Sequence, residues 1–259
     1  MSDLVSNSVL NDSGNASYSQ RLLVGTAATG LVRIEWALAR WGQTIPCNWS
    51  LVQMMQYMDS YVPLRYQVAD AQNLITKAAV EGNYEWLMLI EHDTCPPPDA
   101  FIRFNAYMRE KTAPVVSALY YTRSRPSEPI LYRGRGNSYY GDWKRGDLVW
   151  CDGVPTGLLL IHVPLLRTMW DDSPEYRIRD QVTRRVFETP MAAWFDPETN
   201  QYRTQTGTSD LTWCDRVRNG GYLEKAGWGD FAAEHPEYPF LVDTNIMAIH
   251  IDQDGTRYP

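Results

Sequence analysis

The sequence predicts an α/β protein whose central sheet is mostly parallel, is flanked by helices and carries a small antiparallel element. In the first half of the 259-residue chain, short apolar runs alternate with segments whose apolar residues recur at helical spacing. In the second half, Gly-rich turns separate short apolar runs, which is typical of antiparallel strands. The composition, 44% hydrophobic and 21% charged, is that of a globular domain.

The first elements are a strand and a helix. "RLLVGTAAT", residues 21–29, is predicted to be a strand that runs into a turn of small residues. Residues 30–42 follow as a helix that ends at Gly42. Its predicted inward face is Leu31, Ile34, Leu38 and Trp41. "NWSLVQMMQ", residues 48–56, is predicted to be the next strand.

A second helix–strand pair follows. "QVADAQNLITKAAVEGNY" predicts a helix that ends at Gly82. Its predicted inward residues are Val68, Ala71, Leu74, Ile75 and Ala78 or Ala79. Residues 85–90 form a buried strand, a helix begins near Pro98, and residues 113–121 form another strand.

The second half is less regular. "PTGLLLIHVPLLRTMW" predicts a strand and then a short helix after Pro164. Residues 171–208 are polar with little periodicity, which is typical of an irregular lid or binding loop. "SDLTWCDRVRNGGY" predicts a helix capped by Ser209 and ended by Gly220 and Gly221, and the last apolar segments end near His250.

Composition excludes several classes of protein. Residues 1–20 are polar and acidic, so we expect a flexible arm rather than a signal peptide, with a single domain over residues 21–259. The sequence has no run of 18 or more apolar residues, so no membrane span is predicted. The four cysteines are scattered, which favours a reducing, cytoplasmic setting. The net charge of −7 disfavours nucleic acid as a partner, although the arginines of "RYQ", "YTRSRP" and "RIRDQVTRRV" leave room for a local basic groove.

Polar residues follow the buried strand at residues 85–90. Three interpretations are open for Glu91, His92 and Asp93: a polar turn, a metal or phosphate clamp, or a catalytic pair. Because parallel strands end at one edge of a sheet, we expect this motif and the loop at residues 26–30 to face one crevice. Oxygen ligands at such an edge suit Mg²⁺ or Mn²⁺.

Two later residues carry weaker signals. Asp210 lies at the start of a predicted helix, where it is either a plain cap or a carboxylate kept ionised by the helix N-terminus. His250 follows an apolar strand, where it is either a core histidine or a metal ligand.

Five stretches, taken in their order along residues 22–252, resemble motifs of the GT-A glycosyltransferases, and especially of the family-2-like inverting enzymes. "LMLIEHDTCPPPDAF" is similar to the strand that ends in the D-x-D motif, and "VADAQNLITKAAVEG" to the "ARN" helix. "VVSALYYTR" resembles the strand after it, "VPTGLLLIHVPLL" the "P-x-G" strand, and "GTSDLTWCDRVRNGGY" the "x-E-D" helix. The resemblance implies a GT-A-like, Rossmann-type sandwich.

The resemblance also implies a division of the domain. Residues 21–125 would bind a nucleotide-diphosphate sugar, residues 126–259 would bind an acceptor hydroxyl of unknown class, and residues 171–208 would act as a lid or acceptor loop. Trp194, Trp213 and Trp228 are candidates for sugar contacts, with core packing as the alternative.

The resemblance further assigns roles residue by residue. Asp93 and His250 would bind Mn²⁺ or Mg²⁺, and Glu91 would lie near the metal or the donor ribose. Asp210 would be the catalytic base. The remaining donor-binding candidates are Thr26 and Ala27 in the first loop, His92 at the spacer position of the motif, and Gln72, which replaces the arginine of "ARN".

The implied activity is metal-dependent transfer of a sugar from a nucleotide-diphosphate sugar to a hydroxyl, with inversion. Two departures from the family pattern bear on it: Glu91 replaces the first aspartate, and Ser209 stands where a carboxylate often contacts the acceptor. The alternatives are glycosylation of modified nucleic-acid bases, nucleotidyl transfer, and non-catalytic binding of a nucleotide or glycan. The stretch "VGTAATGLVRIEW" lacks the lysine that nucleotidyl transfer would favour.

Overall fold

A seven-stranded sheet forms the centre of the protein, seen in a computed structural model that describes residues 22–45, 54, 60–134 and 139–259. Its strands, in spatial order, are β2 (Ser60–Tyr61), β1 (Leu22–Gly25), β3 (Trp86–Ile90), β7 (Leu158–His162), β5 (Val115–Leu119), β12 (Phe240–Met247) and β6 (Leu148–Cys151). β7 and β6 run antiparallel to their neighbours, and the other strands share one direction. The predicted α/β sandwich with a mostly parallel mixed sheet is confirmed.

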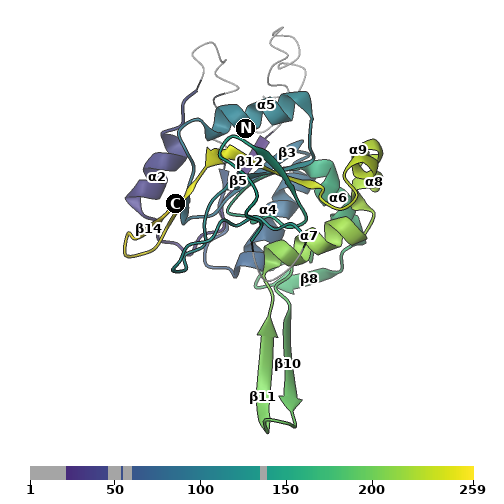
Figure 1. The fold of residues 1–259 in the computed structure, drawn as a ribbon. Coiled ribbons are helices and arrows are strands. Elements are labelled where there is room, and N and C mark those ends of the chain that lie inside the picture. Colours follow the sequence, from purple (N-terminus) through teal and green to yellow (C-terminus); the bar gives the residue numbers. More distant parts are fainter. Residues whose placement is uncertain (1–21, 46–53, 55–59, 135–138) are drawn as a thin grey trace.

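Helices cover both faces of this sheet (Figure 1). One core cluster joins the sheet to α4 (Val68–Glu81), α6 (Val163–Asp172), α7 (Ser209–Asn219) and α8 (Tyr222–Lys225). The other joins it to α2 (Ile34–Trp41) and α5 (Ala100–Glu110). The short α9 (Gly229–Glu234) follows α8 along the chain.

The predicted inward face of α2 is wrong. Leu31, Ile34, Leu38 and Trp41 are all exposed, Leu31 to 87%. The buried residues are Trp36 and Arg40, whose Nε1 and Nη2 donate hydrogen bonds to the Glu91 carbonyl and the Ser60 hydroxyl at 2.7 and 3.0 Å. The helix is therefore held by an amphipathic indole and a buried guanidinium, which counting apolar residues does not detect.

The other first-half elements agree with the sequence. On α4, Ala71, Leu74, Ile75 and Ala79 are buried. The prediction that Val68 points inward is wrong: it is the first residue of the helix and is 49% exposed. The N–H of Gly82 caps the helix on the Ala78 carbonyl. β3, α5 and β5 lie where they are predicted, whereas the strand predicted at residues 48–56 lies outside the described residues apart from Met54.

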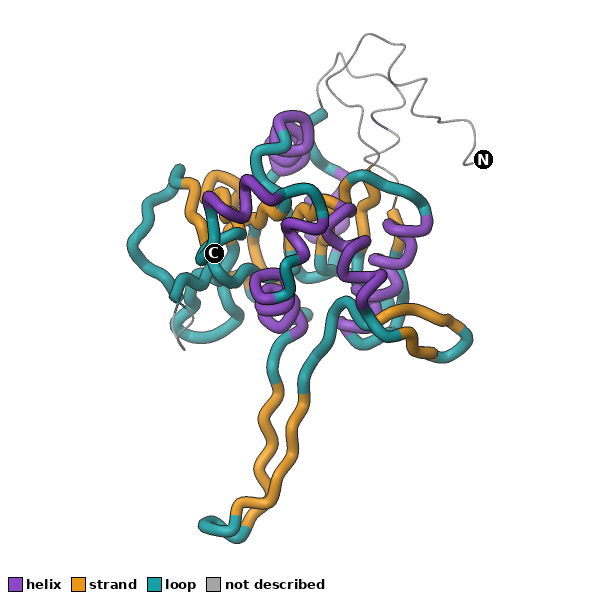
Figure 2. The backbone as a smooth tube through the Cα atoms, turned by 90° about the vertical axis from the view of Figure 1, so that its right-hand side faces the viewer, coloured by secondary structure: helices purple, strands orange, loops and turns teal. Residues whose placement is uncertain are grey.

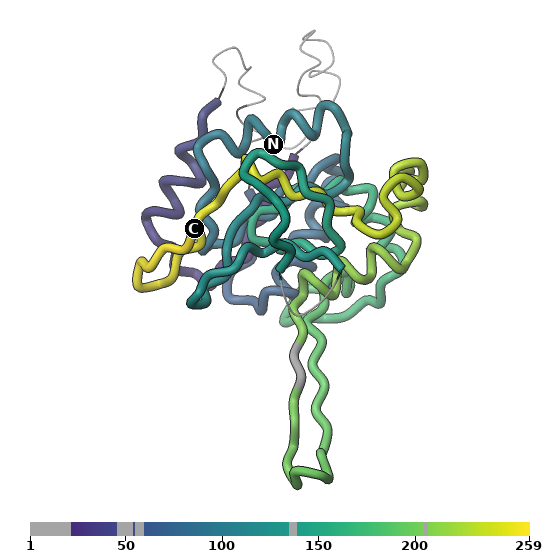
Figure 3. The backbone as a smooth tube through the Cα atoms, viewed as in Figure 1, coloured from purple at the N-terminus to yellow at the C-terminus, as the bar shows by residue number. Residues whose placement is uncertain are grey.

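The expectation of an irregular segment at residues 171–208 is wrong. After the end of α6 the chain forms two antiparallel hairpins, β8 (Glu175–Ile178) with β9 (Gln181–Arg184) and β10 (Met191–Asp196) with β11 (Gln201–Thr206). The β10–β11 hairpin projects from the body as an arm (Figures 1, 2 and 3).

Cross-strand pairs hold this arm. Phe195 and Tyr202 face each other with ring centroids 5.4 Å apart, and Arg203 forms a 2.6 Å ion pair with Asp196. At the turn, Asp196 accepts the N–H of Glu198, and Asn200 adopts a left-handed φ of 54°. Asn is among the few residues that adopt this conformation readily, so the turn was readable in the sequence.

The C-terminal strands lie beside the turn that follows β3. β13 (Ile249–Ile251) pairs with β4 (Thr94–Cys95) and with β14 (Arg257–Tyr258). His250 lies opposite Thr94, and the N–H of Ile251 donates to the Asp93 carbonyl at 2.8 Å. The late histidine is thereby placed beside the acidic motif.

Among the described residues, no helix has both the length and the apolar composition that a membrane span requires.

His162 supplies a test of the core. Its Nδ1 accepts the indole N–H of Trp228 at 3.1 Å, its ring packs on Trp86, and burial lowers its pKa to about 4. The folded protein therefore keeps this ring neutral at pH values where the unfolded chain, with a pKa near 6.5, binds a proton. Stability from this group is complete above about pH 6.5 and is lost as the pH falls toward about 4.

We expect His162→Gln to remove this pH dependence. Urea unfolding of the wild type should lose about 2 kcal/mol more free energy between pH 7 and pH 5 than the variant does. Glutamine keeps an oxygen that can accept the Trp228 N–H, so the comparison isolates the titration. Equal losses in the two proteins would contradict the assignment.

Candidate functional site

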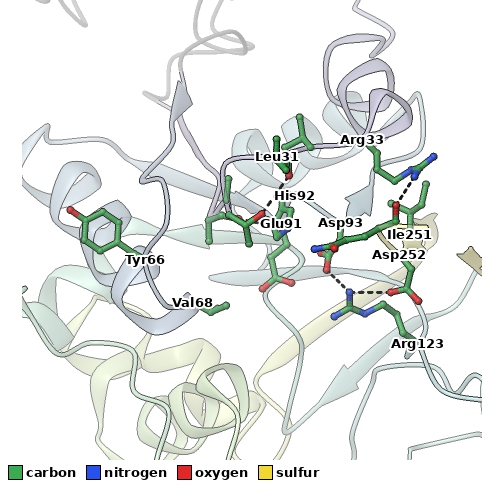
Figure 4. A pocket seen from close by; sticks show the side chains of 15 residues that line it. Leu31, Arg33, Tyr66, Val68, Glu91, His92, Asp93, Arg123, Ile251 and Asp252 are labelled. Atoms are coloured by element: carbon green, nitrogen blue, oxygen red, sulfur yellow. Dashed lines mark hydrogen bonds and ion pairs between the residues drawn. The ribbon is translucent and has the colours of Figure 1, made fainter. Parts of the chain in front are cut away.

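A cavity of about 870 Å³ opens beside the ends of β1 and β3 (Figure 4). Five segments line it: the loop after β1, the segment that enters α4, the turn after β3, the segment after β5 and the C-terminal segment. The lining residues are Ala27, Ala28, Thr29, Leu31, Val32, Arg33, Tyr66, Val68, Glu91, His92, Asp93, Arg123, Ile251, Asp252 and Gln253. The expectation that the loop at residues 26–30 and the motif at 91–93 share one crevice is confirmed for Ala27, Ala28, Thr29 and the motif.

The turn after β3 is fixed by its backbone. The Glu91 N–H donates to the Gly157 carbonyl at 2.8 Å, and the Glu91 carbonyl accepts the Trp36 indole N–H. His92, at the spacer position, joins the two loops: its Nδ1 donates to the Ala27 carbonyl at 3.1 Å and its Nε2 lies 3.5 Å from the Thr29 hydroxyl. The imidazole therefore holds the walls of the cavity together.

Asp93 lies among cationic partners. Its Oδ2 lies 3.0 Å from Nη1 of Arg123, and its Oδ1 lies 3.7 Å from Nε2 of His250, a separation that makes the latter an ion pair rather than a hydrogen bond. His250 is oriented by its Nδ1, which donates to the Tyr121 carbonyl at 2.9 Å.

The pKa values of this pair shift in opposite directions. Burial acts to raise the pKa of Asp93, but the interaction with His250 and the charge of Arg123 outweigh it, so the pKa falls below its usual value. For His250, burial acts to lower the pKa, but Asp93 outweighs it and the pKa is raised. Beside Arg123, the two groups therefore favour each other's charged forms, a carboxylate and an imidazolium.

Glu91 has a different environment. Burial raises the pKa of its carboxyl to about 7, and the negative charges of Asp93 and Asp210 act in the same direction. Its Oε1 accepts the Thr156 hydroxyl at 3.1 Å, and Thr156 in turn accepts the Gln72 amide N–H at 2.9 Å. Gln72 thus reaches the site through Thr156 and does not line the cavity.

Asp210 lies in the first turn of α7, near enough for its charge to act on Glu91 but outside the lining of the cavity. The N-cap is Thr208 rather than the predicted Ser209, which is the first residue of the helix. Thr26 also lies outside the lining: it is buried, and its N–H donates to the Tyr61 carbonyl.

Of the three candidate tryptophans, Trp213 belongs to the core, as the alternative interpretation held, and Trp228 is partly buried against it. Trp213 is fully buried and stacks on Phe187 at 5.4 Å, and Trp228 donates its indole N–H to His162. Trp213 is therefore not placed to contact a sugar. Trp194 lies on the arm and is 44% exposed.

The cavity could hold a divalent cation with only part of its coordination shell from protein. Within the described ranges, no three His, Cys, Asp or Glu side chains form a metal-binding group. Asp93 and His250 are two donors 3.7 Å apart, more than the roughly 3.0 Å between adjacent ligands of an octahedral ion with bonds of about 2.1 Å, so a small side-chain shift would be needed to bring both onto one ion. The buried Oδ1 of Asp93 has no hydrogen-bond partner among the described residues. Because Mg²⁺ commonly keeps waters and substrate phosphates as ligands, two protein donors fit such an ion.

Sequence reasoning missed three residues of this site. Arg123 was read only as part of a basic or solvated stretch, yet it lies between Asp93 and Asp252. The hydroxyl of Tyr120 accepts the Gly157 N–H at 2.6 Å, and Thr156 supports Glu91. Each follows or precedes a buried strand, and that position was the signal available.

Comparison with known proteins identifies the fold. Neither a family model nor a curated protein sequence matches this chain. The crystal structure of A197 from STIV superposes with a TM-score of 0.54 at 13% identity, covering 92% of this chain and 93% of that one. This likeness shows a shared fold.

Two further solved structures are more distant. S. aureus TarS 1–349 in complex with UDP gives a TM-score of 0.43 at 11% identity, covering 88% of this chain and 59% of that one. UDP-glucose pyrophosphorylase complexed with UDP-glucose gives 0.35 at 10% identity, covering 80% and 97%. Both lie below the similarity at which a shared fold can be argued.

Thr156→Val tests the support of Glu91. The change leaves the Gln72 amide and the Glu91 carboxyl without their shared partner, which costs about 1–3 kcal/mol of unfolding free energy. Because the hydroxyl donates to Glu91, it favours the ionised form, so the loss should be larger at pH 8 than at pH 6. Urea unfolding at both pH values measures it. Thr156→Ser keeps the hydroxyl and is the matched control, and equal stability of the two variants would contradict the network.

Proposed function

We propose that the chain is a GT-A-type glycosyltransferase that moves a sugar from a nucleotide-diphosphate sugar to an acceptor hydroxyl, with a divalent cation and with inversion. The observation that supports this most is that Asp93 lines a large cavity beside the end of β3 and lies 3.7 Å from His250, which is buried and outside the lining. A volume of about 870 Å³ lies in the range of pockets that bind cofactor-sized ligands.

Asp93 and His250 would hold Mn²⁺ or Mg²⁺. When bound, such an ion supplies charge neutralisation for a leaving diphosphate. The chain's own residues do the remaining work. The raised pKa of Glu91 lets its carboxyl either donate or accept a hydrogen bond near neutral pH, which suits a ribose hydroxyl. His92 keeps the loop after β1 in place against the motif.

Asp210 would act as the general base. The N-terminus of α7, an 11-residue helix, favours its ionised form, and its Oδ1 already accepts the Leu211 N–H at 2.8 Å. A carboxylate here would remove the proton from an acceptor hydroxyl as that oxygen attacks the anomeric carbon. Attack from the side opposite the leaving group inverts that carbon, which matches the use of a single base.

Residues 126–259 would form the acceptor side, with the arm as its outer part. The arm ends at Thr206, and Asp210 follows four positions later, so the chain connects the two directly. Trp194, Phe195 and Tyr202 are exposed on the arm. Aromatic rings of this kind can pack on the apolar faces of sugars. We therefore assign the arm to acceptor contact.

A thermal-shift panel of nucleotide sugars, with and without Mn²⁺ or Mg²⁺, tests donor binding. We expect one donor to stabilise the protein only with the cation, and Asp93→Asn to abolish the cation-dependent part because it removes a charged ligand. Asp210→Asn should bind the donor as the wild type does and lose about 100-fold or more in turnover.

Matched variants separate these roles from general effects of charge. Asp99→Asn, on the exposed Arg103 pair, and Asp215→Asn, on the same helix as Asp210, should leave donor binding and turnover unchanged. The proposal is abandoned if no nucleotide sugar binds the wild type with either cation. Loss of donor binding in Asp210→Asn would instead show that Asp210 is not the base.

Removing the arm tests the assignment of the acceptor side. The N–H of Gly207 donates to the Pro190 carbonyl at 2.9 Å, so residues 191–206 can be replaced by Asn-Gly without moving the ends. The shortened protein should keep donor binding, while retention on a glycan array seen with the wild type should fall at least about 10-fold. Equal retention by both proteins would exclude the arm as an acceptor contact.

A further inference from the structure

Arg123 bridges two carboxylates at the mouth of the cavity. Its Nη1 lies 3.0 Å from Oδ2 of Asp93 and 3.3 Å from Oδ1 of Asp252 (Figure 4). The side chain is 46% exposed and lines the cavity. We propose that Arg123 pairs with Asp93 as long as no divalent ion is bound there. When the ion binds Asp93, the guanidinium leaves that carboxylate and binds the diphosphate that the ion carries.

The two carboxylates are held in place by the backbone. Asp93 precedes β4 and Asp252 follows β13, which are paired strands, and the Ile251 N–H donates to the Asp93 carbonyl. Asp252 is held further by the hydroxyl of Tyr258, which donates to its Oδ2 at 2.9 Å. These anchored acids would repel each other without a cation between them, and Arg123 is the long, partly exposed side chain that supplies it.

A divalent ion at Asp93 would change this balance. It would bind beside Oδ1 of Asp93 and Nε2 of His250, which brings two positive charges next to the guanidinium on Oδ2 of the same carboxylate. Like charges at this distance repel, so the ion and Arg123 compete for Asp93. The ion alone should therefore bind weakly to the empty protein.

A diphosphate reverses the sign of this coupling. Its oxygens supply new ligands to the ion, and they are partners that a guanidinium binds bidentately. Arg33 also lines the cavity, but its guanidinium is occupied by Glu35 and by the Gln253 carbonyl at 2.8 and 2.7 Å. Arg123 pairs with the two site carboxylates, so it is the arginine that would lose one of its partners, Asp93, when the ion enters.

This inference rests on the proposed function, and its test uses probes that need no knowledge of the donor. Mn²⁺ alone, followed by electron paramagnetic resonance of the free ion, and Mg²⁺–pyrophosphate, followed by calorimetry, are titrated into the full-length wild type and into Arg123→Met. We expect the variant to bind Mn²⁺ at least about 10-fold more tightly and Mg²⁺–pyrophosphate at least about 10-fold more weakly.

Two further variants keep the test decisive. Arg123→Lys keeps the charge without the bidentate fork, so it should bind Mn²⁺ as weakly as the wild type even if Arg123→Met is poorly folded. Arg103→Met, on α5 and paired with Asp99 outside the cavity, should match the wild type with both probes.

The outcomes distinguish this inference from the proposed function. Unchanged or weaker Mn²⁺ binding in Arg123→Met, or tighter Mn²⁺ binding in Arg123→Lys equal to that of Arg123→Met, overturns the competition. Unchanged pyrophosphate binding in Arg123→Met overturns the second role. If the wild type still binds a nucleotide sugar, these results overturn only the role of Arg123, and the proposed function stands.

Discussion

The pairing of β13 with β4 is the constraint on which the candidate site depends. It sets His250 opposite Thr94 and ties Ile251 to the Asp93 carbonyl, so an imidazole from the end of the chain lies beside a carboxylate from its first half. The same pairing brings Asp252 to Arg123. A slip of one residue would turn His250 to the other face of the strand, because side chains alternate along it. The register, more than any single side chain, therefore defines the charge cluster.

Within that cluster, two carboxyl groups on one turn have opposite pKa shifts. Asp93 is kept ionised by His250 and Arg123, whereas burial and the charges of Asp93 and Asp210 raise the pKa of Glu91 to about 7. Environments that separate two such groups usually mark different chemical roles. Asp93 is suited to a cation, and Glu91, supported by Thr156, is suited to a hydroxyl. Under the proposed function, this distinction favours a hydroxyl of the donor over the metal as the partner of Glu91.

The sequence predicts the sheet and the acidic motif, but not the contacts that complete them. β3, α4 and α5 are readable because buried apolar residues recur at strand or helix spacing, as Leu74 and Ile75 do. The face of α2 is misread because Trp36 docks through a hydrogen bond that no periodicity encodes. Trp213 is ambiguous in the sequence, because an aromatic residue near Asp210 could stack on a sugar or pack in the core. Its stacking on Phe187 in the structure shows that it packs in the core. Arg123 meets its partners only through long-range pairing, which one sequence does not reveal.

Gly157 links the turn after β3 to the segment that packs against α7. Its carbonyl accepts the Glu91 N–H, and its own N–H donates to the hydroxyl of Tyr120. A Cβ at this position would meet that hydroxyl and the Thr94 side chain, so only glycine lets the three segments approach. Three residues earlier, Val154 exchanges hydrogen bonds with the thiol of Cys214 on α7, the helix that carries Asp210. One short backbone segment therefore connects the acidic turn to the helix that carries Asp210, which places the charge of Asp210 close enough to act on Glu91 although the two lie far apart in sequence.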